Sequence, residues 1–191
     1  MNRVNKGEYG YLKAYRRGKL VGFIIFAAMI EFIVITMLLA FGSTSRVGIV
    51  FAILLTLPMA KFFIAFILCV RFKQLDENDY KKISDSISNQ YGFLMYDLAI
   101  SQYEGFKFYQ AMCIKNGKIC ALALDKNFST EKKTYEKWIQ SCLKDSKYKY
   151  TIYVYDNMDD YIKKANSISE PNDKTRSIDK HVAQNIKETC I

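Results

Sequence analysis

The chain has 191 residues, of which 50% are hydrophobic, and a formal net charge of +9 at pH 7. This length allows one modest folded domain beside any other elements. It contains 5 cysteines and 1 histidine. The cysteines form no C-x-x-C pair, which excludes the usual zinc sites and a disulfide-rich scaffold. The sequence predicts neither a cofactor nor a metal.

Two apolar stretches, residues 21–41 and 47–70, dominate the N-terminal part of the chain. Each reaches the length of about 20 residues that a helix needs to cross a bilayer. Residues 42–46 form a short polar turn, so the two helices should be antiparallel neighbours. A cleavable signal peptide fits poorly, because the first stretch is too long and the second follows at once. The pattern predicts a transmembrane hairpin.

Basic residues flank this hairpin at its two chain ends. Residues 1–20 carry six basic side chains and one acid, whereas the turn carries only Arg46. The positive-inside rule therefore predicts a multi-pass protein of the cell membrane with both termini in the cytoplasm. A basic cluster at the membrane surface should attract anionic lipid headgroups. It comprises Lys13, Arg16, Arg17, Lys19, Arg71 and Lys73.

Each apolar stretch carries one charge, Glu31 in the first and Lys61 in the second. A lone charge in the bilayer costs at least about 3 kcal/mol. Counting residues from the turn puts both at nearly the same depth, so we expect an intramembrane ion pair. Three roles remain open: a pair that fixes helix register, a contact with another membrane protein or a second copy, and a proton or ion path. Pro58 predicts a kink that frees the carbonyl of Leu54.

The remaining chain predicts a small cytosolic α/β domain over residues 75–168. Asn116-Gly117 at the centre of KNGK is a strong hairpin signal. The near-continuous apolar run of the third strand suggests a central position, covered on both faces. Residues 169–191 form a polar tail with a short terminal helix. We expect α-β-β-β-α-β-α with a mixed four-stranded sheet, in which the main elements are helix 76–90, strands 93–101, 106–114 and 118–125, helix 130–145 and strand 147–155.

This order of elements resembles the core of restriction-endonuclease-like folds. The resemblance implies a metal-binding acid on one strand and an acid-x-Lys pattern on the next. Asp97 fits the first acid, but Asp125 and Lys126 are adjacent and would point to opposite sides of an extended chain. A metal-dependent hydrolase using Asp97 and Asp125 remains the alternative function. Otherwise Asp97 should be an edge-strand or outward-facing acid paired with Lys107 or Lys118, and Asp125 a turn or cap residue.

As a whole, the paired apolar stretches, the KNGK hairpin and the LALD strand end resemble uncharacterised bacterial membrane proteins with an N-terminal hairpin and a small cytosolic α/β domain. The resemblance implies a membrane location and no activity. The soluble part is nearly balanced in charge, which argues against nucleic acid as a partner. We therefore expect a membrane-tethered, non-catalytic interaction module. Its partners would be the lipid bilayer and a membrane protein or a second copy of the chain.

Overall fold

The computed structural model describes residues 4–41, 46–87, 92–102, 105–125, 127–143 and 149–190. The chain divides into two compact units. Leu12–Lys73 form the hairpin unit, and Met1–Tyr11 with Gln74–Ile191 form the α/β domain. The elements are α1 (Tyr11–Phe41), α2 (Arg46–Val70), α3 (Glu77–Ser86), β1 (Phe93–Gln102), β2 (Gly105–Lys115), β3 (Lys118–Leu122), α4 (Phe128–Cys142), β4 (Thr151–Tyr155), α5 (Met158–Asn166) and α6 (Asp173–Thr189).

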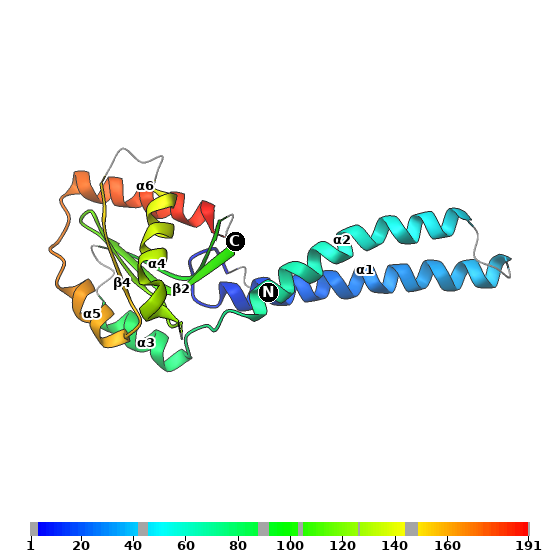
Figure 1. Cartoon of the computed structure of the whole chain (residues 1–191), viewed down its shortest axis with the longest axis horizontal. Coiled ribbons are helices and arrows are strands. Elements are labelled where there is room, and N and C mark those ends of the chain that lie inside the picture. The colour runs from blue at the N-terminus through cyan, green and yellow to red at the C-terminus, as the bar shows by residue number, and fades with distance from the viewer. Residues whose placement is uncertain are drawn as a thin grey trace. The chain divides into compact units, whose positions relative to one another are not determined.

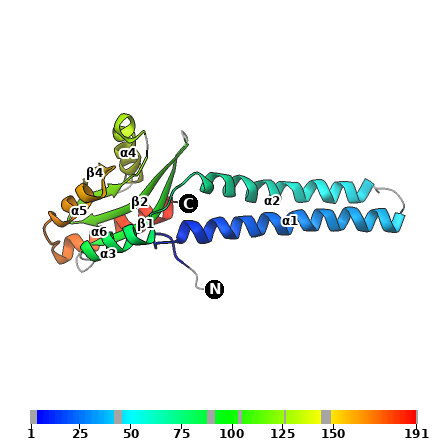
Figure 2. The same cartoon turned by 90° about the horizontal axis from the view of Figure 1, so that it is seen from below.

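In the hairpin unit, α1 and α2 lie side by side and antiparallel (Figure 1 and Figure 2). Aromatic rings join them: the centroids of Phe23 and Phe63 are 5.1 Å apart, and those of Phe26 and Phe62 are 5.5 Å apart. Gly22 allows this approach, because a Cβ there would lie 2.7 Å from the Phe62 ring. Both helices are long and apolar enough to cross a membrane. The expected turn lies almost wholly outside the described residues.

The α/β domain is built on a four-stranded sheet in the order β1-β2-β3-β4. The first two pairings are antiparallel and β3 pairs with β4 in parallel, which confirms the expected mixed sheet. The expected KNGK hairpin is also confirmed. Lys115 pairs with Lys118, and Asn116 (φ 48°) and Gly117 (φ 70°) take the left-handed conformations that a tight two-residue turn requires.

Helices cover both faces of the sheet, so β3 lies at the centre of the domain as expected. On one face, Ile119 and Ala121 pack in a cluster with residues of α4 and α6. On the other, Cys120 and Leu122 pack with residues of α3 and α5. This alternation explains the continuous apolar run of β3, since both faces of a covered strand must be apolar. Helix α4 has an apolar stripe that lies on the sheet and includes the buried Trp138.

Several element boundaries differ from those expected. Strand β3 ends at Leu122, because Asp125 already accepts bonds from the turn that leads into α4. Helix α4 begins at Phe128, two residues before the expected start at residue 130. Helix α3 ends at Ser86. The end of the expected helix 76–90 falls on residues 88–91, which lie outside the described residues. The end of the expected helix 130–145 and the start of the expected strand 147–155 fall on residues 144–148, which also lie outside them.

The C-terminal segment is part of the folded domain, beyond the expected boundary at residue 168. Helix α6 has 17 residues, and Val182, Ala183 and Ile186 are buried in the same cluster as α4. Its few apolar residues recur at helical spacing, which suffices to cover a sheet face although the segment is polar on average. The N-terminal residues before α1 also belong to this unit.

Candidate functional site

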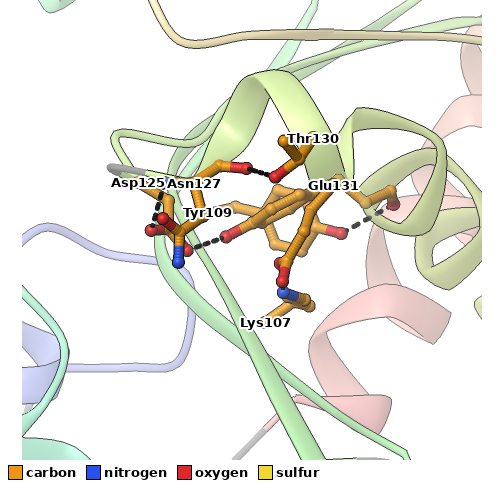
Figure 3. Close-up of polar contacts among 7 residues, drawn as sticks. Lys107, Tyr109, Asp125, Asn127, Thr130 and Glu131 are labelled. Atoms are coloured by element: carbon orange, nitrogen blue, oxygen red, sulfur yellow. Dashed lines mark hydrogen bonds and ion pairs between the residues drawn. The ribbon is translucent and has the colours of Figure 1, made fainter.

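Asp125 lies in a cluster of polar side chains where β2 and the loop after β3 meet the first turns of α4 (Figure 3). Its Oδ1 accepts a hydrogen bond from the backbone N–H of Asn127 at 3.1 Å. Its backbone carbonyl accepts from the N–H of Phe128 at 3.2 Å. This arrangement turns the chain from β3 into α4. Asp125 therefore acts as the turn residue that the sequence suggested.

Tyr135 of α4 connects this turn to the core. Its hydroxyl donates to Oδ2 of Asp125 at 2.7 Å, and its backbone carbonyl accepts from the hydroxyl of Tyr109 at 2.8 Å. The ammonium of Lys107 pairs with Glu131 and lies 4.7 Å from the centroid of the Tyr135 ring. Burial and the bond to Asp125 raise the pKa of Tyr135 well above its ordinary value.

These contacts favour a structural role for the cluster. Both carboxylate oxygens of Asp125 already accept hydrogen bonds, and the raised pKa of Tyr135 makes its hydroxyl a poor acid or base at neutral pH. Among the described residues, no three side chains of His, Cys, Asp or Glu come together as a metal site would require. The geometry gives no support to the alternative of a hydrolase that uses Asp97 and Asp125.

Asp97 lies on the edge strand β1, as one form of the expectation had it. Its side chain is buried, with 2% of its surface exposed, so the expectation of an outward-facing acid is wrong. Its Oδ2 accepts a hydrogen bond from the backbone N–H of Gly10 at 2.9 Å and another from the side-chain amide of Gln74. These donors stand on the two chain segments that flank the hairpin unit in the sequence. The carboxylate thus fastens both segments to the sheet.

The backbone at Asp97 explains why this side chain turns inward. Its φ of 55° is left-handed, which aspartate tolerates better than most residues. Met95 and Leu98 belong to the same core cluster although they are three residues apart in β1, and Tyr109 and Met112 repeat this spacing on β2. In a regular strand such pairs would lie on opposite faces. The alternation of side chains between the two faces of the sheet is therefore shifted by one residue at Asp97 in β1 and at the same level in β2.

Aromatic packing reinforces the attachment of the N-terminal segment. The ring of Tyr9 stacks on Tyr80 with centroids 4.1 Å apart, and Tyr80 lies edge-on to Tyr96 at 4.9 Å. The Tyr9 hydroxyl donates to the carbonyl of Leu75 at 3.0 Å, and the N–H of Tyr96 donates to the carbonyl of Gly7 at 2.9 Å. We name the Asp97 junction as the set Gly7, Tyr9, Gly10, Gln74, Leu75, Tyr80, Tyr96 and Asp97.

Sequence reasoning missed this junction because it treated residues 1–20 only as a basic flank. The signal was the pattern of two glycines around Tyr9, since Gly7 and Gly10 both have a positive φ, 85° and 88°. Glycines at such positions mark a specific path of the backbone, which a solvated basic segment does not need.

In the hairpin unit, Glu31 and Lys61 are both exposed, and no ion pair within 4.0 Å joins them among the described residues. The ring contacts of Phe62 and Phe63 place Lys61 level with residues near 25 of α1. It is thus offset from Glu31 by about 9 Å along the helix axis, more than counting from the turn suggested. Pairing of the two charges within a bilayer stays a prediction.

Pro58 lies inside α2, which continues to Val70. The hydroxyl of Thr56 donates to the carbonyl of Ile53 at 2.6 Å. The kink at Pro58 stays a prediction.

The basic cluster lies at one end of the hairpin, because four of its members stand in the first turns of α1 and the other two follow α2. Within it, Lys19 lies 4.7 Å from the ring centroid of Tyr15 and 5.2 Å from that of Phe62. Its role at the membrane surface stays a prediction.

Comparison of the chain with protein-family models, curated proteins and solved structures gives no match.

Proposed function

We propose that this protein is a membrane-tethered, non-catalytic interaction module. The hairpin unit spans the bilayer twice with both termini in the cytoplasm, and the α/β domain is held at the cytosolic face. There it binds a protein partner or a second copy of the chain.

One observation carries the membrane part of the proposal: large apolar side chains cover the outside of both hairpin helices. Phe32 is 71% exposed, Leu39 82% and Leu57 67%. A continuous apolar surface of this kind is rare on soluble monomers and is typical of contact with lipid or another protein. The basic cluster at one end supports the proposed orientation, since positively charged ends stay in the cytoplasm.

The Asp97 junction supports the tethering role. The Asp97 carboxylate binds the segment before the hairpin and the segment after it. Both chain connections between the domain and the hairpin unit are therefore fastened to the sheet, instead of being flexible linkers. The contacts of Asp125, in turn, favour packing over chemistry.

Two measurements test this proposal. The full chain should stay in the membrane pellet after extraction with alkaline carbonate; release into the supernatant would contradict membrane insertion. Calorimetric titration of the detergent-solubilised chain with Mn²⁺ should give no binding heat. Binding that Asp97→Asn abolishes would instead favour the metal-dependent hydrolase.

A further inference from the structure

We propose that the free edge of β1 near its beginning binds an extended acidic segment of a partner protein, which adds a strand to the sheet. This inference deepens the proposed interaction role and rests on it. It concerns a surface of the α/β domain alone, formed by β1 and α6.

Strand β1 is an edge strand, paired with β2 on one side only. Its other side already accepts backbone contacts from two other pieces of this chain, a turn at Gly7 and the extended residue Cys190. The N–H of Tyr96 donates to the carbonyl of Gly7, and Ile100 forms an antiparallel bridge with Cys190. This edge is therefore a surface on which backbone pairs with backbone.

Leu94 stands two residues before Tyr96. Alternate residues of an antiparallel strand direct their N–H and C=O groups to the same side, so Leu94 presents its backbone groups to the free edge as Tyr96 does. Within the parts of the chain that the structure describes, no hydrogen bond outside the sheet occupies these groups. An incoming strand would find one donor and one acceptor there.

A hollow of about 290 Å³ lies beside this stretch of β1. It is lined by residues 92–95 at the beginning of β1, by Ala183 of α6 and by two cations of α6, Arg176 and Lys187. No acid lies within ion-pair distance of either cation among the residues described. Lys187 also lines a neighbouring hollow together with Lys6. Glu188 is the one acid that lines either of the two hollows.

The two cations that line the hollow indicate an acidic partner. Arg176 and Lys187 are eleven residues apart on one helix, about 16 Å along its axis, which is about five residues of an extended strand. A segment with two acidic side chains four or five residues apart could reach both cations while its backbone pairs with Leu94. An anionic lipid headgroup or free phosphate would use the cations but not the backbone groups of the strand.

The test uses the full chain in detergent micelles and a fluorescent ten-residue peptide of alternating valine and threonine, with two glutamates four residues apart. We expect saturable binding that weakens at least about tenfold when both glutamates are replaced by glutamine. The double variant Arg176→Glu, Lys187→Glu should lose binding to a similar extent. The control double variant Lys133→Glu, Lys137→Glu makes the same charge reversal on α4, away from the hollow, and should leave binding unchanged.

A second variant separates strand addition from simple charge attraction. Leu94→Pro removes the edge N–H and should weaken peptide binding, whereas Leu94→Val should not. Tryptophan fluorescence of Trp138 verifies that each variant is folded. The proposal is overturned if the glutamine peptide binds equally well, if no binding occurs up to about 1 mM, or if Leu94→Pro binds the peptide as well as the wild type does. Displacement of the peptide by phosphatidylserine mixed into the micelles, together with normal binding by Leu94→Pro, would identify an anionic headgroup as the ligand instead. None of these results bears on membrane insertion, because the test is done in detergent.

Discussion

Replacement of Asp97 tests whether the junction contributes to the stability of the α/β domain. Its carboxylate accepts hydrogen bonds from Gly10 and Gln74, both half-buried. In Asp97→Asn the side-chain amide oxygen can still accept both hydrogen bonds, although it carries no charge. Asparagine also tolerates the left-handed backbone conformation. We expect a loss of about 1 kcal/mol, because hydrogen bonds to charged groups are worth somewhat more than neutral ones.

Asp97→Ala should cost more. It leaves two donors without their acceptor, at about 1 kcal/mol or more each. It also forces a side chain with a Cβ and no polar group into φ 55°, at about 1 kcal/mol. The expected loss is about 3 kcal/mol in total. Asp97→Gly removes the same bonds without the backbone penalty, and it should be more stable than the alanine variant by about 0.5 to 1 kcal/mol.

The single tryptophan of the chain makes the assay direct. Trp138 is 3% exposed in α4, so its fluorescence reports unfolding of the α/β domain. Urea unfolding of the full chain in detergent gives the free energy for each variant. Hydrogen exchange at the amide of Gly10 gives a local readout, since protection there should fall in the alanine variant. An alanine variant as stable as the wild type, or an unprotected Gly10 amide in the wild type, would show that the Asp97 carboxylate does not hold these segments.

Three further predictions concern other parts of the chain. Asp179 is fully buried and accepts from the Tyr150 hydroxyl at 2.7 Å, so Tyr150→Phe should lower the unfolding free energy by about 1–3 kcal/mol in the same urea assay; no loss would mean that this bond is dispensable. Burial raises the pKa of the Cys113 thiol from 9.0 to about 12, so the stability it contributes is complete below pH 9 and is lost as the pH rises towards 12. Urea unfolding between pH 7 and 10.5 should show this decline, with a smaller slope in Cys113→Ala. Glu31→Leu and Lys61→Leu should each lower the amount of protein in the membrane while the double variant restores it; single variants at the wild-type level on immunoblots would rule out the pair.

The sheet and the helices that cover it could largely be predicted from sequence. Asn116-Gly117 determines the β2–β3 hairpin by backbone conformation alone, and the apolar run around Cys120 identifies the central strand. Both signals are local, so no knowledge of the rest of the chain is required. The spacing of Val182 and Ile186 was visible too, but the polar composition around them hid how much of the core α6 supplies.

The role of Asp97 could not be predicted in the same way. Its partners, Gly10 and Gln74, are 87 and 23 residues away along the chain. They meet only because α1 and α2 return the chain close to where it left the domain. A single acid inside an apolar strand therefore suggested an outward position or a metal site. In the structure its carboxylate instead accepts hydrogen bonds from a backbone N–H group and a side-chain amide. The positive φ at this residue has no sequence signal apart from the tolerance of aspartate for it.

We propose that the polypeptide crosses the membrane twice and keeps its folded domain in the cytoplasm. The most direct measurement is protease digestion of intact cells that carry the full chain with an epitope after residue 191. We predict that the epitope survives external protease and disappears only after the membrane is permeabilised. Loss of the epitope from intact cells, with a cytoplasmic control protein undigested, would contradict the account.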